Sequence, residues 1–203
     1  MGGPATGPPR EDPYEKAGMD STSLPKIGLG AHDAGMIDTD RLTLTKPTLA
    51  DFDASYAMSS DAAVAEFIGG KPASREDAWN KLLRNIGHWA SYGYGIFTVR
   101  EKARGAFVGE VGLAHFSRSL GEAFDPFPEA AWVLATSAHG KGYATEAVAA
   151  AHIWIDRHQK PQRTVCLIHP DNRASIRVAE KLGYAGFGET EYRGACPIMF
   201  ERP

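Results

Sequence analysis

The feature that most constrains this chain is a glycine-containing loop that connects a strand pattern to a helix pattern. The strand pattern spans residues 129–134, the loop is His139-Gly140-Lys141-Gly142-Tyr143-Ala144-Thr145, and the helix pattern runs from about residue 142 to 158. Glycine lets the backbone approach a ligand closely, and the first amides of a helix have no partner within that helix. Together with the positive end of the helix dipole, these amides predict an anion site suited to a diphosphate. The loop matches neither the Walker pattern nor the dinucleotide-binding fingerprint.

Composition and charge exclude several other classes of protein. The 203 residues are 43% hydrophobic, and the formal net charge of −3 argues against nucleic acid as the main partner, because no strong basic field is available. No stretch approaches the roughly 18 apolar residues of a membrane-spanning helix, so we expect no membrane partner. The only cysteines, Cys166 and Cys196, lie outside metal-ligand spacings. We therefore expect no metal site, no disulfide framework and a cytoplasmic location.

The chain divides into a glycine- and proline-rich segment, residues 1–36, and a periodic domain, residues 37–203. The first segment lacks hydrophobic periodicity, and we expect it to be a flexible arm. In the domain, the patterns predict strands at 41–45, 94–100, 107–116, 129–134, 163–168, 184–188 and 197–201, and helices at 48–58, from Ser74 onward, at 142–158 and at 172–182. This order predicts a mixed sheet flanked by helices.

Two of these helices begin at capping boxes, formed by Thr48 with Asp51 and by Ser74 with Asp77. The helix that begins at Ser74 carries an apolar stripe, which we interpret as a core face. Its members are Trp79, Leu82, Leu83, Ile86, Trp89 and Ala90.

A second constellation lies some 30 residues after the glycine loop, where the next helix pattern begins. It contains Asn172 and Ser175 and ends in Lys181-Leu182-Gly183-Tyr184. Taken singly, Asn172 is typical of a helix N-cap and Ser175 of a helix surface. Joined at this spacing to the strand Glu129-Ala130-Ala131-Trp132-Val133-Leu134 and to the glycine loop, the set resembles the GNAT superfamily of N-acetyltransferases. It looks most like the RimJ/RimL-like branch of ribosomal-protein N-terminal acetyltransferases, over residues 38 to 201.

The resemblance implies a GNAT fold and acetyl-CoA as the cofactor. The implied fold is α+β: a mixed, mostly antiparallel, twisted sheet of six to seven strands, flanked by about four helices. Its fourth and fifth strands, here residues 129–134 and 163–168, splay apart to admit the thioester. The loop amides would bind the CoA diphosphate, and the backbone at the strand end would pair with the pantetheine arm. The implied cofactor-binding residues are Val133, Leu134, Ala135, His139, Gly140, Lys141, Gly142, Tyr143, Ala144, Thr145, Asn172 and Ser175.

Two positions depart from the family pattern. His139 stands where Gln or Arg is usual, which leaves the first contact of the loop open, although the amide cradle does not depend on it. Ala179 stands where many members carry a tyrosine that serves as acid to the thiolate. In the RimJ/RimL-like branch, the position of Ser175 resembles the residue that supports the departing thiolate.

The implied reaction is direct attack of a primary amine on the acetyl thioester in a ternary complex. The amine is a protein N-terminal α-amine or a small-molecule amine. At pH 7, deprotonation costs about 1 kcal/mol for an α-amine and about 4–5 kcal/mol for a lysine, which favours a protein N-terminus. We expect the catalytic residues among Glu129, Ser175 and Glu110, with His115, Glu189 and Glu191 as further candidates near the acceptor. The 117–128 loop, with Glu122 and Asp125, would present carboxylates to a cationic substrate or simply be solvated.

Two other functions stay open at this point. One is a CoA-binding sensor or scaffold with little or no turnover, because neither the acid nor the base is fixed by the sequence. The other is a peptide-binding domain that uses no CoA. The sequence does not determine the oligomeric state, and a homodimer is compatible with it.

Overall fold

The computed structural model describes residues 35–203, so the expected arm of residues 1–36 lies almost entirely outside the described residues. Met36 is described and begins strand β1 (Met36–Asp38), which pairs antiparallel with β2 (Leu42–Thr45). The sequence does not predict β1, because three residues are too few to show alternation.

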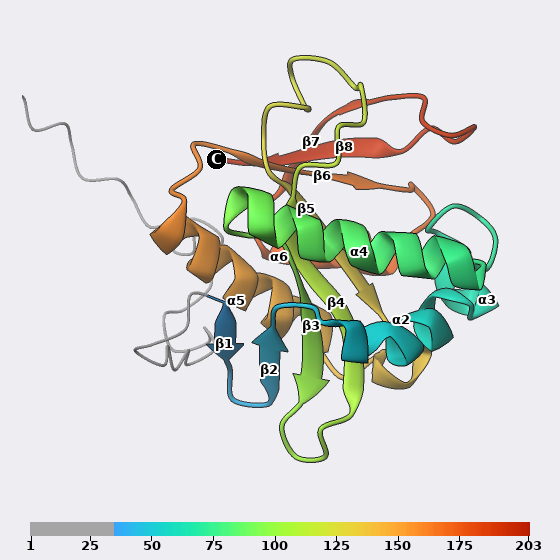
Figure 1. Ribbon diagram of the computed structural model, residues 1–203. Helices are drawn as coiled ribbons and strands as arrows, with labels where there is room; N and C mark the ends of the chain where they lie inside the picture. Colours follow the sequence, from blue (N-terminus) through green and yellow to red (C-terminus); the bar gives the residue numbers. More distant parts are fainter. Residues whose placement is uncertain (1–34) are drawn as a thin grey trace, which may run out of the picture.

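Eight strands form one sheet in residues 35–203, in the order β1-β2-β3-β4-β5-β6-β8-β7. Figure 1 shows β1 and β2 at one end of this sheet and β7 and β8 at the other. Neighbouring strands pair antiparallel except β5 and β6, which are parallel. The predicted mixed, mostly antiparallel sheet is confirmed, and β1 is the added strand. The remaining strands are β3 (Ile96–Glu101), β4 (Phe107–Ala114), β5 (Glu129–Leu134), β6 (Thr164–Ile168), β7 (Ala185–Glu189) and β8 (Ile198–Arg202).

Five α-helices flank the sheet in the described part of the chain, where about four are predicted. They are α2 (Phe52–Ser59), α3 (Ala62–Ala65), α4 (Arg75–Tyr92), α5 (Tyr143–His158) and α6 (Arg173–Lys181), with short 3₁₀ turns η1 (Leu49–Asp51) and η2 (Thr136–Ala138). The unpredicted helix is α3, a single turn that is too short to show periodicity. Both capping boxes are present, at the starts of η1 and α4. None of these helices is long and apolar enough to cross a membrane.

The buried face of α4 is narrower than the expected stripe. Leu82 and Trp89 are buried, but Trp79 and Leu83 are 37% and 43% exposed. The ring of Trp79 instead contacts the edge of Phe52 on α2, with the ring centroids 5.0 Å apart. The prediction that all six stripe residues form a core face is therefore wrong, because they extend around the helix beyond the arc that a neighbouring layer covers.

The functional gap in the fold lies between β5 and β6. The two strands share one register pair, Glu129 with Val165, whereas β6 pairs along its whole length with β8. The backbone of residues 130–133 therefore has no strand partner on its β6 side. This confirms the predicted splaying of the fourth and fifth strands.

Candidate functional site

A cavity of about 420 Å³ occupies the gap between β5 and β6. Residues 130–133 of β5 and 166–169 of β6 form two of its walls, and Asn172 and Ser175 reach it from α6. The 66–70 loop after α3 also lines it. The remaining lining residues come from the loop after β4, the start of β5 and the β7–β8 connection: Arg118, Glu129, Tyr192, Arg193, Ala195 and Pro197. Six separate parts of the chain thus meet around one space.

The predicted anion loop adopts a backbone conformation that favours glycine. Gly140 and Gly142 have φ angles of 73° and 77°, in the left-handed region. Gly142 is the N-cap of α5, so the amides of Tyr143, Ala144 and Thr145 lack acceptors within the helix. A Cβ placed on Gly140 would meet no other atom within 4 Å, so the space beside the loop is open.

Side chains distant in the sequence hold this loop in place. Arg41, between β1 and β2, donates from Nη1 to the Lys141 carbonyl at 2.9 Å and from Nε to Glu146 Oε2 at 2.7 Å. The Arg41 guanidinium also lies 4.7 Å from the centre of the Tyr143 ring, whose hydroxyl donates to Glu101 at 2.6 Å. These contacts fix the loop conformation without any ligand. No local pattern points to Arg41, because its partners are about 100 residues away.

Polar atoms of His139 and Ala135 contact backbone carbonyls of the protein itself. The Nε2 atom of His139 lies 3.0 Å from the Leu134 carbonyl, so the ring folds back on the end of β5. The Ala135 amide donates to the Val108 carbonyl of β4 at 3.0 Å. A role for the His139 ring or the Ala135 amide in binding the cofactor stays a prediction.

The start of α6 presents a hydroxyl to the cavity. Asn172 acts as the N-cap, with its Oδ1 accepting from the Ser175 amide at 3.0 Å. The Ser175 hydroxyl accepts from the Trp132 indole Nε1 at 3.2 Å. Because an indole only donates, Ser175 keeps its own proton for another acceptor.

Of the predicted catalytic carboxylates, Glu129 lines the cavity. Its side chain is 6% exposed and accepts two hydrogen bonds from Arg118, at 2.6 Å from Nε and 2.8 Å from Nη2. Burial raises the pKa of the Glu129 carboxyl, and the ion pair with Arg118 opposes that shift. The third contact of Arg118 runs from Nη1 to the Tyr192 hydroxyl at 2.8 Å.

Glu110 lies outside the lining of this cavity. The Ser55 hydroxyl donates to it at 2.5 Å, and Lys81 forms an ion pair with it at 2.5 Å. Burial would raise the pKa of the Glu110 carboxyl, but Lys81 and Ser55 outweigh burial and lower it. This geometry ties β4 to α2 and α4 and offers no support for Glu110 as a base.

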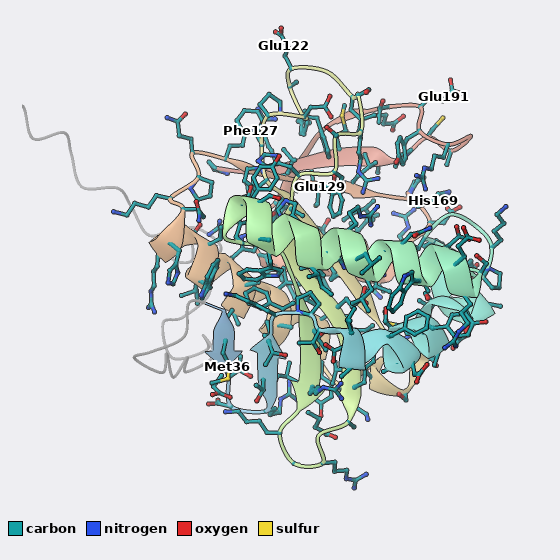
Figure 2. The ribbon with its side chains drawn as sticks, viewed as in Figure 1. Met36, Glu122, Phe127, Glu129, His169 and Glu191 are labelled. Atoms are coloured by element: carbon teal, nitrogen blue, oxygen red, sulfur yellow. The ribbon has the colours of Figure 1, made fainter. Side chains whose placement is uncertain are left out.

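The other acceptor-side candidates also lie away from the cavity wall. Figure 2 shows Glu122 and Glu191 at the tips of two loops, pointing outward and away from Glu129. His115 and Glu189 are also outside the lining. His169, directly after the last residue of β6, does line the cavity. No sequence pattern predicts a role for this histidine.

Comparison with known proteins adds independent information. Residues 41–185 match the family model of the acetyltransferase (GNAT) domain. Over 147 residues the chain is 28% identical to the uncharacterized N-acetyltransferase YnaD of Bacillus subtilis (strain 168), covering 72% of this chain and 81% of that protein. A solved structure assigned to the GnaT family of acetyltransferases, from Bordetella pertussis, is 34% identical with a TM-score of 0.75. That match covers 83% of this chain and 99% of the Bordetella chain.

A more distant structure is that of the ribosomal-protein-S5-alanine acetyltransferase from Vibrio fischeri. It is 20% identical to this chain with a TM-score of 0.63, and the match covers 82% of this chain and 95% of that one. At this identity, the likeness shows the fold alone.

Proposed function

Since this chain belongs to the acetyltransferase (GNAT) domain family, and is therefore an acyltransferase that uses acetyl-CoA, we propose that it acetylates a primary amine by direct attack in a ternary complex. One observation carries the proposal. The edge of β5 that faces β6 is unpaired beyond Glu129 and leads directly to the glycine loop at the start of α5. A free strand edge that ends at an anion site fits an elongated ligand with a phosphate end.

The residues present fit the diphosphate and the pantetheine arm of the cofactor. The amides of residues 143–145 would bind the diphosphate, with the loop from His139 to Gly142 close around it. The backbone of Val133 and Leu134 would hold the pantetheine arm, and the amide group of Asn172, which lines the cavity, would donate to the same arm. Acetyl-CoA supplies an acetyl group that is already activated as a thioester. The protein's task is then to align the amine and to manage two protons.

Ser175 is our proposed donor to the departing sulfur. Its hydroxyl is positioned by the Trp132 indole and retains a proton that points to no other acceptor among the described residues. Ala179, where many relatives carry tyrosine, is fully buried in the core. A hydroxyl at the start of α6 therefore takes the place of one farther along the helix.

Glu129 is our proposed general base, acting directly or through a water molecule. Each carboxylate oxygen has a second acceptor site beyond the bond to Arg118, so an amine proton can still be accepted. A raised pKa makes Glu129 a better base than an ordinary surface carboxylate. The demand on it is smallest for an α-amine, whose deprotonation at pH 7 costs about 1 kcal/mol.

The finer classification follows the same reasoning. The motif from Asn172 through Ser175 to Lys181–Tyr184 supports the RimJ/RimL-like branch, in which the acceptor is a protein N-terminus. A small-molecule α-amine makes the same chemical demand. Both cysteines, Cys166 and Cys196, are free thiols, from which we infer a reducing, cytoplasmic location.

Calorimetric titration with acetyl-CoA tests the cofactor site. We expect binding in the micromolar range or tighter and none for Gly142→Glu, which places a carboxylate beside the proposed diphosphate. Gly105→Glu is the matched control, because Gly105 also has a left-handed φ but lies in the β3–β4 turn. A Cβ on Gly105 would meet nothing within 4 Å, and one on Gly142 would make only an ordinary contact with Arg41 at 3.5 Å. Normal affinity in Gly142→Glu would place the cofactor elsewhere.

A thiol-release assay with amine and peptide panels tests turnover. We expect amine-dependent CoA release, with the acetylated product identified by mass. Tight acetyl-CoA binding without release from any amine would favour the sensor or scaffold alternative instead.

A further inference from the structure

Three arginines alternate with two aromatic rings in a row, of which Arg118, Tyr192 and Arg193 line the cavity. The guanidinium carbon of Arg118 lies 4.8 Å from the centre of the Phe116 ring and 5.0 Å from that of Tyr192. Arg84 of α4 lies on Phe116 at 5.7 Å, and Arg193 lies on Tyr192 at 5.3 Å. Neighbouring charges that share a ring are therefore within roughly 10 Å of each other. We call these five residues the arginine ladder.

The arginine ladder carries more positive charge than its surroundings neutralise. Glu129 neutralises Arg118, but Arg84 and Arg193 form no ion pair within residues 35–203. Partial burial, together with the charges of Arg118 and Arg193, lowers the pKa of the Arg84 guanidinium.

Two carboxylates face the same region, and neither neutralises the ladder. Glu110 interacts with Arg84 electrostatically but is already paired with Lys81. Glu66 lines the cavity from the loop after α3 and forms no ion pair with either arginine. Among residues 35–203, the guanidinium of Arg193 on the cavity wall and that of Arg84, which stacks on Phe116 outside the lining, thus form no ion pair.

Arg193 occupies a turn position that seldom holds arginine. Tyr192 and Ala195 form a bridge across a two-residue turn, in which Arg193 and Gly194 have φ angles of 53° and 79°. Such turns favour Asn, Asp or Gly at both central positions, because φ is positive at each. Local structure does not explain an arginine here, and strained residues of this kind concentrate at functional sites.

The arginine ladder lies at the far end of β5 from the proposed diphosphate site. Glu129, which pairs with Arg118, begins the strand, and the glycine loop follows its last residue, Leu134. Five residue steps along an extended strand separate the two ends by about 17 Å. The ladder therefore faces the acceptor and not the CoA phosphates.

We propose that the acceptor carries a carboxylate next to its amine, as a free amino acid or its close derivative does, and that Arg193, on the cavity wall, binds that carboxylate while Arg84 adds positive charge beside it. This inference rests on the amine acetylation proposed above, and within it selects a small-molecule α-amine over a protein N-terminus, whose amine is followed by an amide. A guanidinium recognises a carboxylate through two parallel hydrogen bonds, and the aromatic rings hold the planar groups in place. The amine of such an acceptor would then lie near Glu129, which is paired with the middle arginine of the ladder.

The first test compares amino acids with their carboxamides as acceptors in the thiol-release assay. The two differ only in the negative charge. We expect kcat/KM to be at least about tenfold higher for the carboxylates. Arg193→Asn, which suits the turn, should raise KM for the carboxylates about tenfold and change KM for the amides less than twofold. Arg84→Gln should act in the same direction.

Arg75→Gln is the matched control for Arg84→Gln, because Arg75 is also on α4 and stacks on an aromatic ring, Phe52, at 4.5 Å but does not belong to the arginine ladder. It should leave both KM values unchanged. Equal use of amides and carboxylates would overturn the inference. A preference for a polyamine such as spermidine would also overturn it and would indicate that Glu66 binds a cationic acceptor. The function proposed above would survive that result.

The second test is independent of turnover. Calorimetry of the CoA-loaded protein with N-acetyl amino acids and with their carboxamides should show tighter binding of the carboxylates, and this difference should be lost in Arg193→Asn. Equal affinities would overturn the inference. If acetyl-CoA itself fails to bind, the function proposed above fails, and the same titration on the protein alone still decides the carboxylate site.

Discussion

The two ends of the proposed site consist of different chemical groups. On the proposed cofactor side, the loop from His139 to Gly142, the first amides of α5 and the open edge of β5 present backbone groups. On the proposed acceptor side, Arg118, Glu129 and Tyr192 present side chains that hydrogen-bond to one another. A backbone site recognises one constant ligand and tolerates many sequences, whereas a side-chain site changes its specificity with each substitution. The cofactor side therefore identifies the family, and the acceptor side must identify the substrate.

The largest effect should come from breaking the ion pair on the acceptor side. Arg118→Met leaves the carboxylate of Glu129 buried without its partner, and loss of one partner of a buried pair costs about 3–5 kcal/mol. We expect a fall of about 3 kcal/mol in the free energy of unfolding, measured by urea denaturation at pH 7.

A double variant separates this effect from simple loss of packing. Arg118→Met with Glu129→Gln removes both charges and should recover at least half of the lost stability. No recovery would mean that the stacking of Arg118 on Phe116 and Tyr192, and not its charge, stabilises this side.

The next largest effect should come from Ser175, where the two sides meet. Ser175→Ala should lower kcat without weakening the binding of acetyl-CoA. We expect kcat to fall about tenfold while the dissociation constant of acetyl-CoA stays within about twofold, because the hydroxyl is needed only as the sulfur leaves. Trp132→Phe removes the bond that orients Ser175 and should give a smaller fall. Equal loss of affinity and of kcat in Ser175→Ala would make the serine part of the cofactor site alone.

The same division explains what the sequence can predict. The glycine loop, the N-cap Asn172 and the strand 129–134 are local patterns, and the fold confirms the elements that carry them. Arg41 and Tyr192 act on partners about 100 and 74 residues away, so no local pattern marks them. For the acceptor side, the sequence predicts Glu129, which lines the cavity, but also Glu110, Glu122 and Asp125, which do not, because charge in a sequence does not show which way a side chain points.

The stability of the protein should depend on pH through a buried histidine on α5, the helix that follows the glycine loop. His152 of α5 is fully buried, with its Nε2 3.0 Å from the Tyr184 hydroxyl and its Nδ1 3.5 Å from Arg202. Burial, and then the charge of Arg202, lower the pKa of the His152 imidazole well below its ordinary value. The unfolded chain therefore takes up a proton below about pH 6.5 that the folded protein does not. Stability should fall as pH drops below that value, by up to about 1.4 kcal/mol per pH unit.

Urea denaturation between pH 5.5 and 7.5 measures this slope. His152→Gln should flatten it, because the titrating group is gone. Tyr184→Phe keeps the histidine and removes only its hydrogen bond, so we expect lower stability with the wild-type slope. Identical slopes in all three proteins would show that other groups cause the loss of stability at low pH.

The smallest effect should come from the loop that suggested a cationic substrate. Glu122 lies at the tip of this loop, away from Glu129, and Asp125 accepts from the Gly121 amide at 2.7 Å (Figure 2). Because neither carboxylate lines the cavity, Glu122→Gln with Asp125→Asn should change KM for the acceptor less than about twofold, as expected of an exposed and a half-buried charge outside the site. Arg193→Asn provides the contrast, since it also alters an exposed charge but one on the cavity wall. If the loop variant instead raised KM several-fold for cationic amines while Arg193→Asn had no effect, the acceptor side would recognise positive charge through its loop, and specificity would lie outside the cavity.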